Sequence, residues 1–104
     1  MNKAIEKIKV IAMDVDGVLT DGSIFLDSQG REFKRFHSQD GLALVLARNA
    51  GLKTAMITAR KSKAVSVRAR ELKVDALYQN RIDKVEALED LMRRFKVRPD
   101  EVCY

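Results

Sequence analysis

Two aspartates separated by a single residue are the strongest chemical signal in the sequence. Asp14 and Asp16 follow an apolar run at residues 9–13, whose length and Val and Ile content predict a buried strand. Side chains two positions apart can face the same way where a strand ends. Two neighbouring carboxylates repel each other, which favours a hard cation with oxygen ligands, typically magnesium. The sequence therefore predicts a magnesium site, where the metal would lower the repulsion between an attacking carboxylate and an anionic phosphate.

Short apolar runs alternate with amphipathic segments, and this alternation predicts the elements that position the aspartates. Strands are expected at residues 9–13, 53–58, 75–78 and from 101 onward, and helices at residues 40–49, 62–72 and 82–95. The expected fold is α/β, a Rossmann-like parallel sheet with flanking helices. Runs at residues 23–26 and 32–36 predict a β-hairpin inserted after the first strand. Ligands bind at the carboxyl ends of parallel strands, where Asp14 and Thr58 fall.

The overall composition is that of a globular domain. The chain has 104 residues, 46% hydrophobic and 34% charged, and is expected to form one domain over residues 1–104. No apolar run has the length of a membrane span or a signal peptide, so we expect no membrane partner. Cys103 is the single cysteine, which excludes an intrachain disulfide and fits a cytoplasmic location. The formal charge of +5 is interleaved with acids, which favours a solvated basic surface over a nucleic-acid partner.

Residues 14–21, Asp-Val-Asp-Gly-Val-Leu-Thr-Asp, resemble the first motif of the haloacid dehalogenase superfamily. The resemblance implies that Asp14 is a nucleophile that forms an aspartyl-phosphate, and that Asp16 is a general acid and then a base. It also implies Mg²⁺ held by Asp14 and by the backbone carbonyl of Asp16. Thr58 matches the second motif and Lys84 the third, which implies phosphate binding. Considered alone, Thr58 would be a helix cap and Lys84 a surface lysine, but their order after the first motif favours the functional interpretation.

A finer resemblance is to the small sugar-acid phosphatases of this superfamily that lack a cap domain. It is carried by residues 19–22, by the hairpin, by Phe36 with Asp40 and Gly41, by residues 60–62 with Arg68, and by residues 77–79. The resemblance implies a magnesium-dependent phosphatase that hydrolyses a sugar-acid phosphate such as 3-deoxy-D-manno-octulosonate 8-phosphate. It further implies a cytoplasmic enzyme of lipopolysaccharide biosynthesis and a homotetramer formed through the hairpin.

The same resemblance implies a set of substrate-binding residues. They are Asp16, His37, Ser38, Gln39, Asp40, Gly41, Arg60, Arg68 and Lys84. Two arginines suit a phosphosugar that carries a carboxylate, although Arg68 reads equally well as a solvated helix charge. The branch usually has asparagine at the position of His37 and often arginine at that of Gln39, and a further substrate arginine is replaced by Val45. These departures leave the sugar open.

The fourth motif of the superfamily is an acidic pair after the strand that begins at Glu101, and the chain ends at Tyr104 without it. The resemblance implies that this pair supplies the last protein ligand to magnesium. We therefore expect the 104 residues to be the N-terminal portion of the fold, with the C-terminal part missing, and to show little or no activity alone.

Two other interpretations compete with a phosphatase, and the second of them is the least supported by the sequence. A non-catalytic oligomerisation module, as in the related domains attached to acylneuraminate cytidylyltransferases, would use an exposed hairpin with Ile24, Phe25, Phe33 and Phe36. A receiver-type phosphoacceptor also uses aspartates, a threonine and a lysine. It requires an adjacent acidic pair and a phosphorylated aspartate on a later strand, and this arrangement is absent from the sequence.

Overall fold

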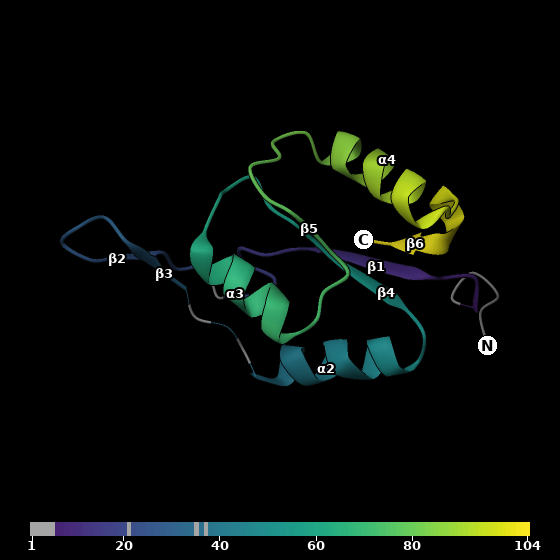
Figure 1. Cartoon of the computed structure of the whole chain (residues 1–104), viewed down its shortest axis with the longest axis horizontal. Helices are drawn as coiled ribbons and strands as arrows, with labels where there is room; N and C mark the ends of the chain where they lie inside the picture. The colour runs from purple at the N-terminus through teal and green to yellow at the C-terminus, as the bar shows by residue number, and fades with distance from the viewer. Residues whose placement is uncertain (1–5, 21, 35, 37) are drawn as a thin grey trace.

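The computed structural model describes residues 6–20, 22–34, 36 and 38–104, and a parallel sheet forms the centre of the fold (Figure 1). The strands of this sheet are β1 (Val10–Asp14), β4 (Lys53–Ile57), β5 (Ala76–Tyr78) and β6 (Val102–Cys103), in the order β5-β4-β1-β6. The helices are α2 (Ser38–Asn49), α3 (Lys63–Glu71) and α4 (Lys84–Phe95), followed by the 3-10 helix η1 (Pro99–Glu101). Every pairing in this sheet is parallel, which confirms the expected α/β class.

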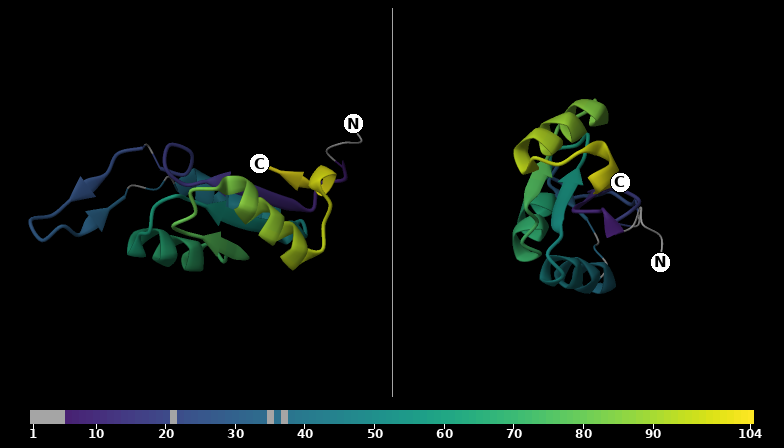
Figure 2. Two further views of the ribbon diagram at one scale, coloured as in Figure 1. Left: turned by 90° about the horizontal axis from the view of Figure 1, so that it is seen from above. Right: turned by 90° about the vertical axis from the view of Figure 1, so that its right-hand side faces the viewer.

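The two faces of the sheet are covered by different helices, α4 on one face and α2 with α3 on the other (Figure 1 and Figure 2). The buried side chains on the α4 side are Val10, Ala12, Ala55, Ile57, Ala76, Tyr78, Ala87 and Leu91. Those on the opposite side are Val15, Leu19, Leu44, Met56, Val65, Ala69 and Leu72. Successive side chains of β4 thus pack in opposite layers of the core, which explains why the sequence of this strand is a continuous apolar run.

The strand order reverses beside β1. The chain passes from β1 to β4 and β5 with helices on one face, and then crosses by α4 to β6 on the other side of β1. Ligands of open α/β sheets bind at the carboxyl ends of the strands next to such a reversal. Asp14 is the last residue of β1, so the topology brings it to this position.

The predicted hairpin is present and projects from the layered body (Figure 2). It consists of β2 (Phe25–Leu26) and β3 (Glu32–Phe33), which pair antiparallel. The Asp27 carboxylate holds the turn, because its Oδ1 accepts hydrogen bonds from the N–H groups of Gln29 at 2.9 Å and Arg31 at 2.7 Å. A bridge between Thr20 and Phe36 closes the base of the hairpin.

Several element boundaries differ from the sequence predictions. The helix expected to begin at Asp40 begins at Ser38, so Asp40 lies in its first turn, where the helix dipole favours an acid. The last helix begins at Lys84 rather than near residue 82, because the Asp83 carboxylate caps it. It ends at Phe95, as predicted, where Lys96 caps it in the left-handed conformation rather than Pro99 breaking it. None of the described helices is both long enough and apolar enough to cross a lipid bilayer.

Candidate active site

Asp14 reaches the site from the end of β1, where the register pairs it with Ile57 of β4. It is two and four residues beyond Ala12 and Val10, both of which pack in the layer beneath α4. Side chains at such spacing share one face of a strand, so Asp14 faces α4.

Lys84 reaches the same point from the first residue of α4. Its Nζ donates a hydrogen bond to Asp14 Oδ1. The helix is fixed behind it by buried Ala87 and Leu91, and its first turn is capped by Asp83, whose Oδ1 accepts from the N–H groups of residues 85 and 86. Lys84 is therefore held by a capped and packed helix terminus.

Tyr104 is a second donor to Asp14, and the sequence analysis did not find it. Its hydroxyl donates to the same oxygen, Oδ1. Tyr104 lies just beyond β6, which pairs with β1 in the register Val10 to Val102, so the sheet brings together two residues 90 positions apart. No local sequence pattern could have indicated this contact.

These donors determine the charge state of the site. Burial acts to raise the pKa of Asp14, but the hydrogen bonds from Lys84 and Tyr104 outweigh it and hold the pKa below its ordinary value. The hydrogen bond to Asp14 raises the pKa of Lys84. Burial, followed by the hydrogen bond to Asp14, raises the pKa of Tyr104. At neutral pH Asp14 is therefore an anion beside a cation, the state that a carboxylate nucleophile needs.

Asp16 lies in the tight loop that follows β1. The carbonyl oxygen of Val15 accepts hydrogen bonds from the N–H groups of residues 18, 19 and 20 at 2.9 to 3.3 Å. Gly17 has a φ of +79°, a conformation that glycine adopts without strain. Asp16 Oδ1 lies 2.5 Å from Nζ of Lys34, which comes from the hairpin and was also missed by the sequence analysis. The loop thus places Asp16 between β1 and the hairpin.

Thr58 follows β4 and is buried, with 5% of its surface exposed. Its N–H donates to the carbonyl of Tyr78 at 2.9 Å, and its Oγ1 accepts from the N–H of Arg60 at 3.2 Å. A cavity of about 280 Å³ opens here, lined by Asp14, Val15, Asp16, Ile57, Thr58, Ala59, Arg60 and Lys84. The four residues predicted from the motifs therefore share one cavity, together with Arg60.

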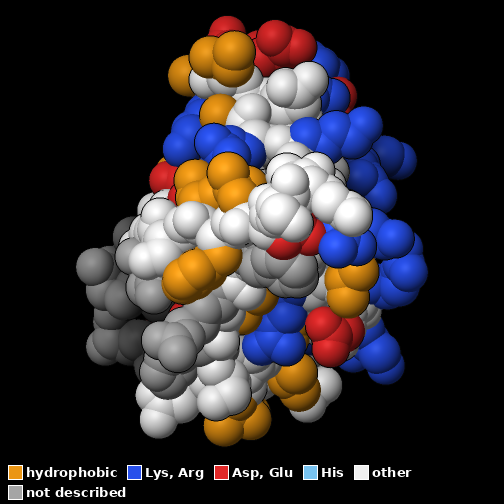
Figure 3. Space-filling view, turned by 90° about the vertical axis from the view of Figure 1, so that its left-hand side faces the viewer, with side chains coloured by type: hydrophobic (Ala, Val, Ile, Leu, Met, Phe, Trp, Pro, Cys, Tyr) orange, Lys and Arg blue, Asp and Glu red, His pale blue; other side chains and the backbone are white. Residues whose placement is uncertain are grey.

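Arg68 lies on α3 and lines a different cavity, of about 750 Å³, between the hairpin and that helix. Its guanidinium carbon lies 5.8 Å from the centroid of the Phe36 ring. A β-carbon at Gly41 would come within 2.7 Å of a guanidinium nitrogen of Arg68, so a larger residue there would displace the end of the Arg68 side chain. The molecule seen from the hairpin end shows Lys and Arg side chains prominent on this face (Figure 3).

The predicted segment at residues 37–41 is only partly positioned by the structure. His37 lies outside the described residues. Ser38, Gln39 and Asp40 form the first turn of α2 and line neither of the two cavities described above. Their role as substrate-binding residues stays a prediction.

Comparison with solved structures identifies the class of protein. The chain matches over 98% of its length a 3-deoxy-D-manno-octulosonate 8-phosphate phosphatase of Moraxella catarrhalis in complex with magnesium, phosphate and KDO, with a TM-score of 0.90 and 40% identity. It covers 60% of that chain. It also matches over 96% of its length a Legionella pneumophila protein described as a HAD superfamily (subfamily III A) hydrolase, with a TM-score of 0.92 and 37% identity, and covers 55% of that chain. The chain shares its fold with these structures, and its homologues are members of the haloacid dehalogenase superfamily.

Sequence relatives identify the branch. The chain is 38% identical over 104 residues to the 3-deoxy-D-manno-octulosonate 8-phosphate phosphatase KdsC of Salmonella typhi, and 37% identical over 99 residues to that of Escherichia coli K12. It covers 55% and 53% of these proteins, so it spans about half the length of the curated relatives it matches. No family model matches the chain. Its homologues are phosphatases of the branch that the sequence motifs indicated.

Proposed function

We propose that the protein is a magnesium-dependent phosphomonoesterase that acts on a sugar-acid phosphate such as 3-deoxy-D-manno-octulosonate 8-phosphate. The observation that carries the proposal is the convergence of Asp14, Asp16, Thr58 and Lys84 on one cavity at the carboxyl ends of β1 and β4. The homologues are phosphatases, and one of them is known in complex with magnesium, phosphate and KDO. We also propose a cytoplasmic location, in line with the resemblance to this branch and with a single cysteine, Cys103.

The site fits magnesium by the chemistry of its donors. Asp14 and Asp16 offer carboxylate and carbonyl oxygens, the ligands of hard cations. In the described part of the chain no group of three or more His, Cys, Asp or Glu residues gathers at one point. Magnesium is commonly held by one or two carboxylates together with substrate phosphate, so this pair fits it. When bound, the cation supplies neutralisation of the phosphate charge.

The residues of the chain then have separate tasks. An Asp14 oxygen attacks phosphorus and forms an aspartyl-phosphate, while the bond to the leaving oxygen breaks and Asp16 gives that oxygen a proton. Asp16 next takes a proton from the water that attacks the aspartyl-phosphate, which releases phosphate and restores Asp14. Thr58 binds a phosphate oxygen through its hydroxyl, and Lys84 neutralises negative charge on Asp14 and on the phosphate.

We assign the sugar-acid part of the substrate to basic residues that line the two cavities. Arg60 lines this cavity, and Arg68 lines the larger one. A guanidinium can hold a carboxylate through two parallel hydrogen bonds, which suits a sugar acid. We include the first turn of α2, from Ser38 to Gly41, in the substrate site on the strength of the branch resemblance.

The replacement Asp14→Asn tests the nucleophile. We expect the protein expressed from its natural gene to release phosphate from the sugar-acid phosphate in the presence of Mg²⁺, and the variant to lose more than about a thousandfold in kcat. Asp100→Asn is a matched control, because it removes the same charge from an exposed residue outside the cavity. Undiminished turnover by the Asp14 variant would show that another group attacks phosphorus.

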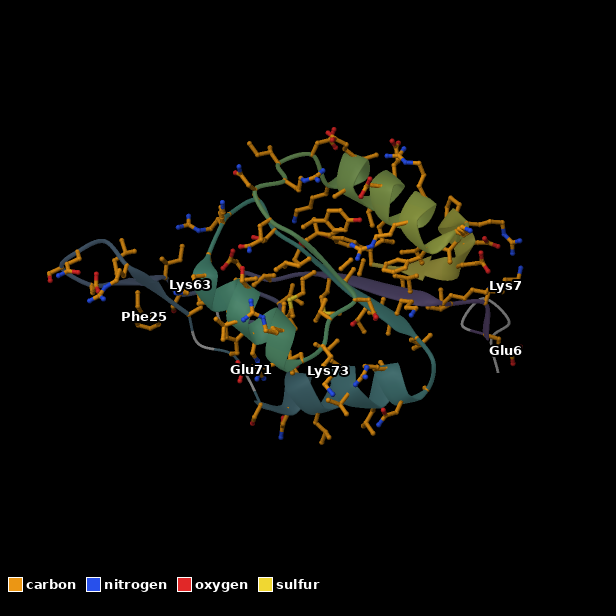
Figure 4. All side chains as sticks on the ribbon, in the orientation of Figure 1. Glu6, Lys7, Phe25, Lys63, Glu71 and Lys73 are labelled. Atoms are coloured by element: carbon orange, nitrogen blue, oxygen red, sulfur yellow. The ribbon has the colours of Figure 1, made fainter. Side chains whose placement is uncertain are left out.

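A second candidate function is assembly, and the hairpin favours it. Ile24, Phe25 and Leu26 are 43%, 50% and 66% exposed. Phe25 stands on the projecting hairpin, outside the layered body (Figure 4). Phe36 does not belong to this exposed set, because it packs against the core on the α2 and α3 side. We propose that the hairpins of four copies pair to form a homotetramer.

The paired replacement Phe25→Ser and Leu26→Ser tests the assembly. We expect a tetramer in sedimentation equilibrium and its dissociation in the double variant, because burial of these side chains drives association. Val67→Ser is a control, since Val67 is also exposed, at 43%, but lies on α3. A tetramer without phosphate release would favour the non-catalytic module, and a monomeric parent protein would contradict the assembly proposal.

A further inference from the structure

Lys34 is a residue through which the hairpin contacts the candidate active site. It directly follows β3, and its Nζ lies 2.5 Å from Asp16 Oδ1. Its side chain is 0% exposed, whereas that of Asp16 is 29% exposed. A charge removed from water is costly unless it is paired, and the Asp16 carboxylate pairs with this buried ammonium. The ion pair therefore restricts the position of the Asp16 carboxylate.

The hairpin and the loop that carries Asp16 are also joined through Thr20. Thr20 pairs with Phe36 across the base of the hairpin. Its Oγ1 accepts hydrogen bonds from the N–H groups of Gly17 at 3.2 Å and Gly22 at 3.1 Å. Thr20 is buried, with 7% of its surface exposed. The base of the hairpin and the Asp16 loop thus form one hydrogen-bonded unit, and Lys34 is its charged contact with the cavity.

From this geometry we infer that Lys34 is a positioning residue for the leaving-group step. The inference rests on the proposed function, in which Asp16 gives a proton to the leaving oxygen. Lysine has three donors and no acceptor, so the Asp16 oxygen that it holds, Oδ1, accepts a hydrogen bond and does not carry the transferable proton. The proton is therefore directed to Oδ2.

The proton then follows one path through both half-reactions. It leaves Oδ2 for the leaving oxygen as the bond from phosphorus to that oxygen breaks and the bond from Asp14 to phosphorus forms. When water attacks the aspartyl-phosphate, Oδ2 takes a proton from the water and the bond from Asp14 to phosphorus breaks. Water is the only co-reactant, and Lys34 keeps its own protons throughout.

The positions of the two cavities suit a substrate whose leaving group extends past Asp16 toward the larger cavity, between the hairpin and α3. The smaller cavity is lined by Asp16, and the larger one is lined by its partner Lys34. The ion pair therefore stands between the two spaces. Lys63 and Glu71, which also line the larger cavity, stand on α3 (Figure 4). A substrate with its phosphate beside Asp14 and Thr58 would extend its leaving group past Asp16 toward this space.

The test uses two substrates that differ in their need for the proton. The oxygen that leaves from 3-deoxy-D-manno-octulosonate 8-phosphate is an alkoxide and needs protonation, whereas the one that leaves from p-nitrophenyl phosphate is stable as an anion. We expect Lys34→Met to lower kcat on the sugar-acid phosphate by about 10- to 100-fold and on p-nitrophenyl phosphate by less than about threefold. Lys34→Arg should restore part of the loss. Lys53→Met, at the start of β4, removes the same charge and should change neither value.

Equal losses on both substrates, or no loss on either, would overturn the positioning role. A double-mutant cycle in urea unfolding checks the ion pair without reference to activity. Asp16→Asn should lower the unfolding midpoint more in the Lys34 protein than in the Lys34→Met variant, and additive changes would overturn the ion pair. A parent protein that hydrolyses neither substrate would overturn the proposed function, and the cycle would still decide whether Lys34 fixes Asp16.

Discussion

Lys84 and Tyr104 donate to the same oxygen of Asp14, and this shared acceptor connects two strands and a helix at one atom. Asp14 ends β1, Lys84 begins α4, and Tyr104 follows β6. Each donor offsets part of the cost of burying the carboxylate, so the site is organised around a charged Asp14. The chemistry at this residue depends on how firmly α4 and β6 are held.

Replacement of Lys84 should show how much the positive charge beside Asp14 contributes to turnover. We expect Lys84→Met to lower kcat/KM by about 100- to 1000-fold, because one preorganised cation is lost from the transition state. Lys84→Arg should retain part of the activity, since it keeps the charge but changes the geometry. The measurement is steady-state kinetics with Mg²⁺ and the sugar-acid phosphate. Arg93→Met, which removes an exposed cation from the last turn of the same helix, serves as control, and equal activity of both variants would contradict the assignment.

The residues of the site divide according to what the sequence could predict. Asp14, Asp16, Thr58 and Lys84 were found because each lies at, or within two residues of, the end of a strand or the start of a helix, in the order of a known motif series. Lys34 and Tyr104 were missed because their partners lie 18 and 90 positions away. Such contacts depend on how the hairpin folds back and on which strand neighbours β1. They become visible only when the elements are assembled.

At the scale of elements, the sequence predicted types better than ends. Strand β4 was expected at residues 53–58 and helix α3 at residues 62–72, and the observed bounds differ by one residue at each changed end. The first turn of α2 was missed because Ser38 and Gln39 belong to no apolar periodicity. The predicted end of α4 at residue 95 is confirmed, but the left-handed Lys96 ends the helix there and Pro99 does not. Local backbone conformation, which periodicity does not report, decided these boundaries.

Glu101 connects η1 and β6 to the residue before β1 through its carboxylate. Because this carboxylate is buried and paired, the stability of the protein is expected to depend on pH. The Glu101 carboxylate is buried, pairs with Lys9 Nζ at 2.5 Å and accepts from the Arg98 N–H at 2.9 Å. The hydrogen bond from Lys9, followed by that from the Arg98 N–H, holds the pKa of Glu101 below its ordinary value of 4.5. A carboxylate whose pKa is lowered by folding stabilises the protein above its unfolded pKa, and this stabilisation is lost as pH falls through the folded pKa.

We therefore expect Glu101→Gln to be less stable than the parent protein at neutral pH, with the difference shrinking as pH falls below 4.5. Urea unfolding at a series of pH values measures it. Glu89→Gln, a change at an exposed residue of α4, should leave the pH profile unchanged. A constant difference between parent and variant across this range would show that Glu101 acts through packing and not through its charge.

At the scale of the whole molecule, a layered body and a projecting hairpin together extend 50 Å along the longest axis (Figure 1). The body places the site at one end of its sheet, beside the hairpin, and the Lys34 contact joins the two parts. Composition could not predict this arrangement, since exposed Phe25 and Leu26 count as hydrophobic in the same way as buried Met56 and Ile57. Only the position of the hairpin outside the core separates these two sets.

A site with two carboxylates should bind magnesium and phosphate together better than either alone. Asp14 and Asp16 line one cavity, and magnesium is commonly held by one or two carboxylates together with phosphate oxygens. Reciprocal linkage then requires each ligand to increase the affinity of the other. A ligand present at a hundredfold excess over its Kd stabilises the folded state by about 2.7 kcal/mol.

We expect the unfolding temperature to rise with Mg²⁺ and phosphate together by more than the sum of the separate rises. EDTA should abolish the extra rise and so should Asp14→Asn, whereas Asp100→Asn should retain it. Additive rises in the parent protein would show that the two ligands bind at separate places, and the metal would then have to be assigned to a site other than Asp14 and Asp16.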